Sequence, residues 1–153
     1  MKFNRESGVL LHPTSLPSKY GIGDLGKTAY EFVDFLYNSK QRLWQLLPLG
    51  PVGYGESPYQ SFSAFAGNTM LISIDKMIEL ELLTIQDTLP IPRFNENEVD
   101  FESVKAYKQE LFKMAFKRFS VINNKSFENF LQDNKIWLEE YSFFMALKNH
   151  FVV

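Results

Sequence analysis

Residues 46–68 read LLPLGPVGYGESPYQSFSAFAGN, a long segment with neither helical nor strand periodicity after its first apolar residues. Loops of this length are usually functional or disordered, and disordered segments contain few aromatic residues. Here Tyr54 and Tyr59 stand among side chains with hydroxyl and amide groups, such as Ser57 and Gln60. Aromatic faces beside such groups suit a ligand with apolar CH faces and many hydroxyl groups. The segment therefore predicts a sugar-binding loop.

The composition bounds what the rest of the chain can be. Its 153 residues are about the size of one domain, and 45% hydrophobic residues exclude global disorder. Sixteen Lys and Arg against eighteen Asp and Glu leave a net charge of −2, which gives no reason to expect nucleic acid or an anionic membrane as partner. The sequence has no cysteine, no apolar run long enough to span a membrane and no signal-peptide core at its start. These features predict a soluble, cytoplasmic protein.

A strand–helix–strand unit precedes the loop. Residues 8–12 and 43–49 are short apolar runs, typical of strands buried on both faces of a parallel sheet. Between them, residues 27–41 are predicted to be helical, with Thr28 and Glu31 as a capping box and Asp24 as a second capping candidate. The apolar residues at helical spacing are Ala29, Phe32, Val33 and Leu36. The order predicts an α/β fold with two parallel strands.

The segments after the loop become mainly helical. Residues 70–74 are predicted as a short third strand and 75–82 as a helix, with a further turn at Thr84 and Asp87. A proline-containing connector at 89–98 follows. Three helices are then predicted from apolar residues three and four positions apart, over 100–119, 126–131 and 136–148.

Residues 21–26 read GIGDLG, which matches the pattern of a dinucleotide-binding turn and would indicate an oxidoreductase. That motif should follow its strand directly, yet residues 13–20 intervene, and the second strand ends without the expected acidic residue. The two histidines, His12 and His150, lack the spacing of metal ligands. We therefore expect neither an organic cofactor nor a metal, and dinucleotide binding remains a remote alternative.

Four motifs closely resemble the amino-terminal portion of amylomaltase, the bacterial 4-alpha-glucanotransferase also called disproportionating enzyme. They are GVLLHPTSLP at 8–17, GIGDLG at 21–26, WQLLPLGP at 44–51 and GYGESPYQSFSAFAGN at 53–68. Shorter landmarks follow in the same order: VDFE at 99–102, WLEEY at 137–141 and FMALK at 144–148. The resemblance spans essentially the whole chain.

The resemblance implies the amino-terminal part of a TIM (β/α)8 barrel with a mainly helical insertion after the second or third strand. Residues 1–88 would form the first βαβ units, including a glucan-contacting loop at 50–69, and residues 89–153 a mainly helical inserted subdomain. The remainder of the barrel would be absent. Loops at the carboxyl ends of barrel strands build the active site, so the segments after residues 12 and 49 would lie on that face. An open barrel face would also favour self-association.

The resemblance also implies particular site residues and partners. Ser57 and Tyr59 would approach the sugar next to the cleaved bond, and Tyr54 would make an accessory glucan contact. From the residues alone, Tyr59 could instead pack the loop and Ser57 could be a turn residue before proline. The partners would be maltooligosaccharides and other α-1,4-glucans.

The implied reaction is the transfer of α-1,4-glucan segments between maltodextrins by a retaining double displacement, which needs two carboxylates about 5 Å apart. In the family both come from motifs later in the chain. The chain would thus hold no catalytic residue and be inactive alone, since Asp24, Glu56, Asp75 and Asp100 match other family positions. The alternative is a non-catalytic glucan-binding or regulatory fragment.

Overall fold

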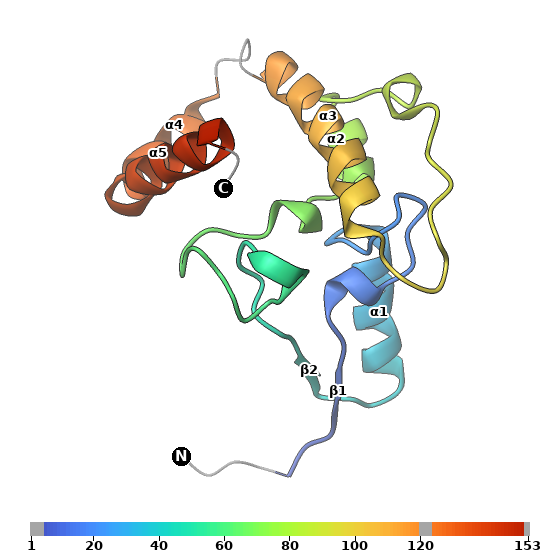
Figure 1. The fold of residues 1–153 in the computed structure, drawn as a ribbon. Helices are drawn as coiled ribbons and strands as arrows, with labels where there is room; N and C mark the ends of the chain where they lie inside the picture. Colours follow the sequence, from blue (N-terminus) through green and yellow to red (C-terminus); the bar gives the residue numbers. More distant parts are fainter. Residues whose placement is uncertain (1–4, 120–123, 152–153) are drawn as a thin grey trace.

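The computed structural model describes residues 5–119 and 124–151. Within them lie two short strands and five α-helices, in the order shown in Figure 1. The elements are β1 (Gly8–Leu10), α1 (Lys27–Asn38), β2 (Leu43–Gln45), α2 (Ile74–Glu79), α3 (Phe101–Phe119), α4 (Lys125–Asp133) and α5 (Lys135–Phe151), with 3-10 turns between them. No described helix is both long and apolar enough to cross a membrane.

The predicted strand–helix–strand unit is confirmed. β1 and β2 pair in parallel, with Val9 opposite Trp44, and α1 makes the connection between them (Figure 1). Gly8 allows the close approach of the strands, because a Cβ there would lie 2.4 Å from the backbone oxygen of Leu43. The Trp44 indole N–H donates a 2.8 Å hydrogen bond to the carbonyl of Leu11, just beyond β1.

The predicted length and burial of the strands are wrong. Each strand has only three residues, and Leu10 and Leu43 are both more than half exposed. The apolar run identified strand residues correctly, but a strand is buried on both faces only if further layers cover it. Among the described residues the sheet has two strands and closes no barrel.

The predicted third strand at 70–74 is also wrong. The segment contains a 3-10 turn, η3 (Thr69–Leu71), and then the start of α2. The Asn68 side chain accepts a hydrogen bond from the backbone N–H of Met70, and the Ser73 hydroxyl accepts one from that of Lys76. Such side-chain bonds to the backbone start helical turns and compete with strand pairing, which explains the difference.

Helix α1 begins where predicted but without the predicted capping box. Its N-cap is Gly26, which makes no side-chain cap, and the carboxylate of Asp24 accepts a 2.8 Å hydrogen bond from the Gly26 N–H. The second capping candidate is therefore the one that contacts the helix start. The helix ends at Asn38, three residues earlier than predicted, where Lys40 takes a left-handed conformation with φ of 59°.

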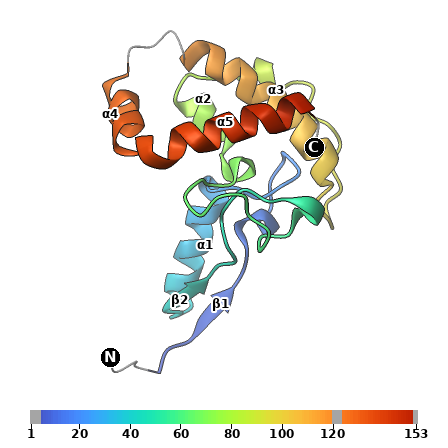
Figure 2. The same cartoon turned by 60° about the vertical axis from the view of Figure 1, so that its left-hand side comes forward.

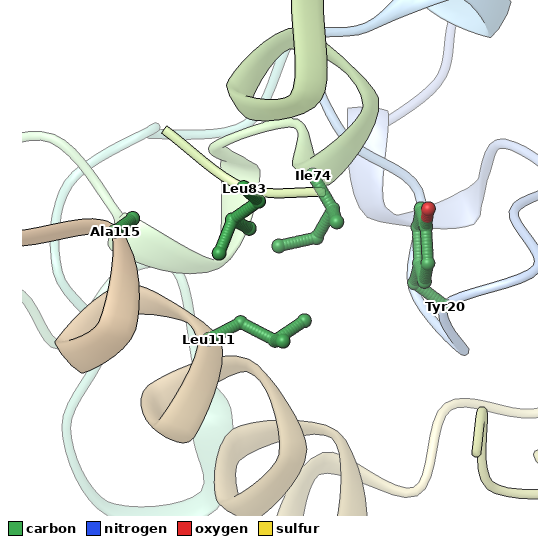
Figure 3. Close-up of a cluster of buried hydrophobic side chains, with 5 residues drawn as sticks. All are labelled: Tyr20, Ile74, Leu83, Leu111 and Ala115. Atoms are coloured by element: carbon green, nitrogen blue, oxygen red, sulfur yellow. The ribbon is translucent and has the colours of Figure 1, made fainter. Parts of the chain in front are cut away.

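The main core lies between α2, α3 and the segment before α1. Figure 3 shows five of its buried side chains: Tyr20, Ile74, Leu83, Leu111 and Ala115. A second cluster joins Ile22, Met70 and Val104. The three helices predicted beyond residue 100 are confirmed as α3, α4 and α5, and α4 and α5 lie side by side apart from this core (Figures 1 and 2).

Candidate functional site

The segment after β2 folds back on itself, and we refer to residues 50–69 as the site loop. At its base the N–H of Asn68 donates a 2.8 Å hydrogen bond to the carbonyl of Leu49, and an antiparallel bridge joins Val52 to Ser61. Within it, the Ser63 hydroxyl accepts hydrogen bonds from the N–H groups of Phe65 and Ala66. The loop thus has a defined shape although it contains no regular strand or α-helix.

The parallel strand pair fixes where the loop leaves the sheet. Because β1 and β2 run in the same direction, the segments that follow them emerge from the same edge. The segment after β1 forms the turn η1 (Pro13–Ser15), in which the His12 side chain contacts the Thr14 hydroxyl at 2.7 Å. The sheet therefore places the site loop beside the loop at 11–20.

Two consecutive left-handed residues reverse the chain at the tip of the loop. Gly55 has φ of 69° and Glu56 has φ of 55°. Ser57 follows them as the first residue of a turn in which the Gln60 N–H donates to the Ser57 carbonyl at 3.1 Å. The Ser57 hydroxyl also accepts a weak 3.4 Å hydrogen bond from the Tyr59 N–H. Ser57 is thus a turn residue whose side chain is partly exposed.

The two tyrosines predicted for the site are the most exposed aromatic residues of the loop. Tyr54 is 94% exposed and Tyr59 is 72% exposed, so their rings and hydroxyl groups are accessible to a ligand. Exposure on this scale gives Tyr59 little packing within the chain. An exposed aromatic ring flanked by hydroxyl and amide groups offers both a stacking face and hydrogen bonds.

A hollow of about 540 Å³ lies between the site loop and the end of α5. It is lined by Gly53, Tyr54, Gln60, Ser61, Phe62 and Lys148. Tyr54 contributes to this lining, whereas Ser57 and Tyr59 do not. Of the three predicted site residues, the structure therefore places Tyr54 alone at this hollow.

The sequence favours packing roles for Phe62 and Phe65, and the structure confirms that both rings pack against α5, whereas the contact of Lys148 with the loop was not predicted. The Lys148 ammonium lies 3.5 Å from the centre of the Phe62 ring, and Phe65 stacks on Trp137 with ring centres 5.8 Å apart. The Phe62 ring also packs against the Phe144 ring, with ring centres 5.9 Å apart. In the helix predicted over 136–148, helical spacing places Trp137, Tyr141, Phe144 and Met145 in one stripe, which favours a core or a face that docks onto the rest of a barrel. In the structure Trp137 and Phe144 of this stripe contact rings of the loop, and Figure 2 shows α5 running above it.

Two lysines of α3 contact the site loop and the segment that directly follows it. Lys105 forms an ion pair with Glu56, and the buried ammonium of Lys108 donates to the carbonyls of Met70 and Ile72 at 2.6 and 2.8 Å. Burial lowers the pKa of Lys108 to about 8, and burial also raises the pKa of Asp24, whose charge acts on Lys108. These contacts connect the helical region to the site loop.

The four acids considered in the sequence all bond to protein groups. Asp24 bonds to Gly26, and Glu56 to Lys105. Asp75 accepts from the Tyr20 hydroxyl at 2.9 Å and pairs with Lys19 at 3.0 Å. Asp100 accepts from the N–H and hydroxyl groups of Ser103 at the start of α3. Across residues 5–119 and 124–151, no group of three or more His, Cys, Asp or Glu side chains is arranged to hold a metal.

The glycines at 21–26 pack against protein groups. A Cβ at Gly21 would lie 2.4 Å from the Phe94 ring, and one at Gly26 would lie 2.4 Å from the Ser73 hydroxyl. Asp24 places a carboxylate at the start of α1, where a dinucleotide fold would bind phosphate. Like charges there oppose phosphate binding, so the geometry gives no support to the dinucleotide alternative.

Comparisons with known proteins agree with the geometry. A family model described as 4-alpha-glucanotransferase matches residues 11–152. The chain is 49% identical over 149 residues to a 4-alpha-glucanotransferase of Streptococcus pneumoniae serotype 4, covering 96% of this chain and 30% of that protein. It is 45% identical over 152 residues to a 4-alpha-glucanotransferase of Thermus thermophilus, and this match covers 97% of this chain and 30% of that protein.

The same relationship holds in three dimensions. The structure described as amylomaltase from Streptococcus agalactiae in complex with acarbose superposes with a TM-score of 0.90 at 40% identity, covering 97% of this chain and 30% of that chain. The chain thus spans about 30% of the length of the curated relatives reported above.

Proposed function

The chain belongs to the 4-alpha-glucanotransferase family, and we propose that it is the amino-terminal portion of an amylomaltase. The complete enzyme would transfer α-1,4-glucan segments between maltodextrins by a retaining double displacement. The observation that carries this proposal is the site loop, which bears the family motif and presents Tyr54 and Tyr59 to solvent beside Ser57. A homologous structure is described as a complex with acarbose, which supports an oligosaccharide ligand.

Each predicted site residue has a distinct proposed role. The exposed ring of Tyr59 would stack on the CH face of a sugar while its hydroxyl makes a hydrogen bond. Ser57, two residues earlier in the same turn, would add a second hydroxyl contact to the same sugar. Tyr54 would bind a more distant part of a long glucan, because it lines the hollow with Gln60 and Lys148, whereas Ser57 and Tyr59 do not. Sugar binding would thus extend along the loop.

The catalytic carboxylates belong to the proposed enzyme but not to this chain. Retaining transfer needs one carboxylate as nucleophile and a second as acid and base. The four acids considered in the sequence have hydrogen-bond or ion-pair partners within the protein. We therefore propose that the chain alone binds glucan without turnover. A non-catalytic glucan-binding or regulatory role is the second candidate.

A maltotriose titration of the purified chain tests sugar binding. Tyr59→Phe should weaken binding by about 0.5–1.5 kcal/mol through the loss of a hydrogen bond, and Tyr59→Ala should weaken it further because the ring is also lost. Tyr37 on α1 is similarly exposed, so Tyr37→Ala is a matched control that should leave binding unchanged. Equal affinities for the wild-type chain and Tyr59→Ala would contradict the assigned role.

The same samples test the division between binding and chemistry. We expect no sustained glucose release when the chain is incubated with maltotriose. Release that survives repurification would show that a carboxylate pair lies within these residues. Release that appears only when the remaining part of the relatives' sequence is supplied would support the amylomaltase proposal over the regulatory one.

We also propose self-association through the open face of the sheet. The segment would be the first βαβ units of a TIM barrel at 1–88, followed by a mainly helical inserted subdomain at 89–153. Leu10 and Leu43 of the strands, and Leu46 just after β2, are exposed in the chain by itself. Exposed apolar surface near an open strand edge favours association. Light scattering should detect dimers or larger species, and a monodisperse monomer would contradict this part.

The remaining parts of the proposal concern location and partners. We propose a cytoplasmic protein whose partners are α-1,4-glucans, with neither nucleic acid nor membrane among them. The nearly balanced charge of the sequence supports the partner assignment.

A further inference from the structure

One ion pair connects the helical region directly to the tip of the site loop. Lys105, in the second turn of α3, contacts the Glu56 carboxylate across 49 positions of sequence. The side chains are only 35% and 22% exposed, respectively. Ion pairs that are partly removed from water are screened less than exposed ones, so this contact has more influence on the loop than a surface pair would.

Glu56 occupies a backbone position that needs support. Its φ of 55° is left-handed, a conformation that is unfavourable for a residue with a Cβ. It directly follows Gly55, which is also left-handed, and directly precedes Ser57. The orientation of Glu56 therefore sets the direction in which the turn from Ser57 to Gln60 leaves the tip of the loop.

The Glu56 carboxylate depends strongly on Lys105. Its Oε1 atom contacts the Lys105 ammonium, while its buried Oε2 atom has no hydrogen-bond donor among the described residues. Without the lysine a partly buried carboxylate would lose its neutralising charge, and it would regain hydration by moving toward solvent. Because Glu56 adjoins Ser57, that movement would displace the turn that carries Tyr59.

A second lysine fixes the other end of the same segment. Lys108 lies one helical turn after Lys105 and donates to the carbonyls of Met70 and Ile72, just beyond Asn68 at the base of the loop. Residues one turn apart on a helix share a face. One face of α3 therefore holds the segment from 56 to 72 at both ends.

We propose that α3 positions the sugar-binding turn of the site loop through the Lys105–Glu56 ion pair. Lys105 and Glu56 are positioning residues: they act through Ser57 and Tyr59 and do not themselves touch the glucan. The helical region after residue 100 thereby becomes part of the binding machinery. This inference rests on the proposed glucan-binding function of Ser57 and Tyr59.

The test compares three variants of the full 153-residue chain. Lys105→Met removes the charge and keeps most of the side-chain length, and Lys105→Arg restores the charge. The matched control is Lys113→Met on the same helix, because Lys113 pairs with Glu110 at 2.7 Å in an exposed position. Each variant is measured by maltotriose titration, thermal unfolding, and hydrogen exchange of the backbone amides of Glu56, Tyr59 and Gln60.

We expect Lys105→Met to raise the Kd for maltotriose by about tenfold and to accelerate exchange of the three amides. Lys105→Arg should stay within about twofold of the wild-type Kd, and Lys113→Met should match the wild type. Amides in the interior of α3 should keep their wild-type protection in all variants. This pattern would separate positioning of the loop from a general loss of stability.

A double variant keeps the test decisive if Lys105→Met does not fold. Lys105→Met with Glu56→Gln removes both charges, so no unpaired carboxylate is left, and the loop still lacks its ion pair. Wild-type Kd and wild-type amide exchange in the double variant would overturn the inference. If the wild-type chain does not bind maltotriose, the proposed function fails. Backbone amide exchange at Glu56 and Tyr59 that is unchanged in Lys105→Met would separately overturn the positioning role.

Discussion

The two longest helices, α3 and α5, contribute to the molecule in different ways. α3 buries Val104, Lys108, Leu111 and Ala115 in the interior formed with α2 and the segment before α1. α5 has as many aromatic residues as α3, five in each helix, yet each of its side chains, all of them described, is at least partly exposed. Aromatic content therefore does not by itself make a core, because burial also requires facing elements that close around the side chains.

The two helices also contact the site loop differently. α3 contacts it by charge, through Lys105 at Glu56, and α5 contacts it by ring packing, through Trp137 at Phe65 and Phe144 at Phe62. The loop depends on one helix that is anchored in the core and on another that is not. We infer that α3 sets the stability of the chain and the position of the loop tip, whereas α5 shapes the outer part of the site loop.

Two isoleucines test this comparison most severely. Ile74, at the start of α2, belongs to the core cluster that contains Leu111 and Ala115 of α3, and Ile74→Ala should destabilise the chain by about 2–5 kcal/mol, because the side chain is fully buried and its removal leaves a cavity. Ile136 in α5 is 91% exposed, so Ile136→Ala should change the free energy of unfolding by less than about 0.5 kcal/mol. Urea unfolding of both variants gives the comparison, and similar losses would show that α5 belongs to the core.

The next largest effect is a pH dependence of the free energy of unfolding that comes from the titration of Lys108. Its pKa is lowered to about 8 in the folded chain, from an ordinary value of 10.5. Between these values the unfolded chain binds more protons at this site, so the free energy of unfolding should rise with pH, by about 1–2 kcal/mol from pH 8 to pH 9.5. Urea unfolding of the wild type at several pH values measures this slope.

The matching variant is Lys108→Met, which should lose the slope. Measurements are best kept below pH 10, because burial raises the pKa of Tyr20 to about 12 and the deprotonation of unfolded tyrosine lowers stability above pH 10. A slope of equal size in Lys108→Met would assign the effect to another group.

The smallest effect concerns the ring contact between α5 and the site loop. A double-mutant cycle with Phe65→Leu and Trp137→Leu should give a coupling of about 0.5–1.5 kcal/mol, since the rings stack with 21° between their planes. The free energy of unfolding of the four proteins supplies the coupling. A value near zero would show that α5 and the loop do not stabilise one another.

Most local features followed from the sequence. Helical spacing located α3, α4 and α5 to within a few residues, and the two apolar runs around a helix predicted the parallel pair β1 and β2. These predictions succeeded because periodicity depends on which side chains share one face of an element. The strand predicted at 70–74 failed because Asn68 and Ser73 bond to the backbone locally, which a count of apolar residues does not register.

The site shows the same division. The sequence by itself determined the loop, the tyrosines it carries and its family, because those depend on residue types in a fixed order. Only the tertiary structure revealed that Lys105 contacts Glu56, 49 positions away, and that Lys108 contacts Met70, 38 positions away, so that both ends of the segment from 56 to 72 are held. It also revealed that α5 packs against Phe62 and Phe65. Contacts between residues so far apart arise when separate elements pack together, and no local pattern specifies which lysine will meet which carboxylate or carbonyl.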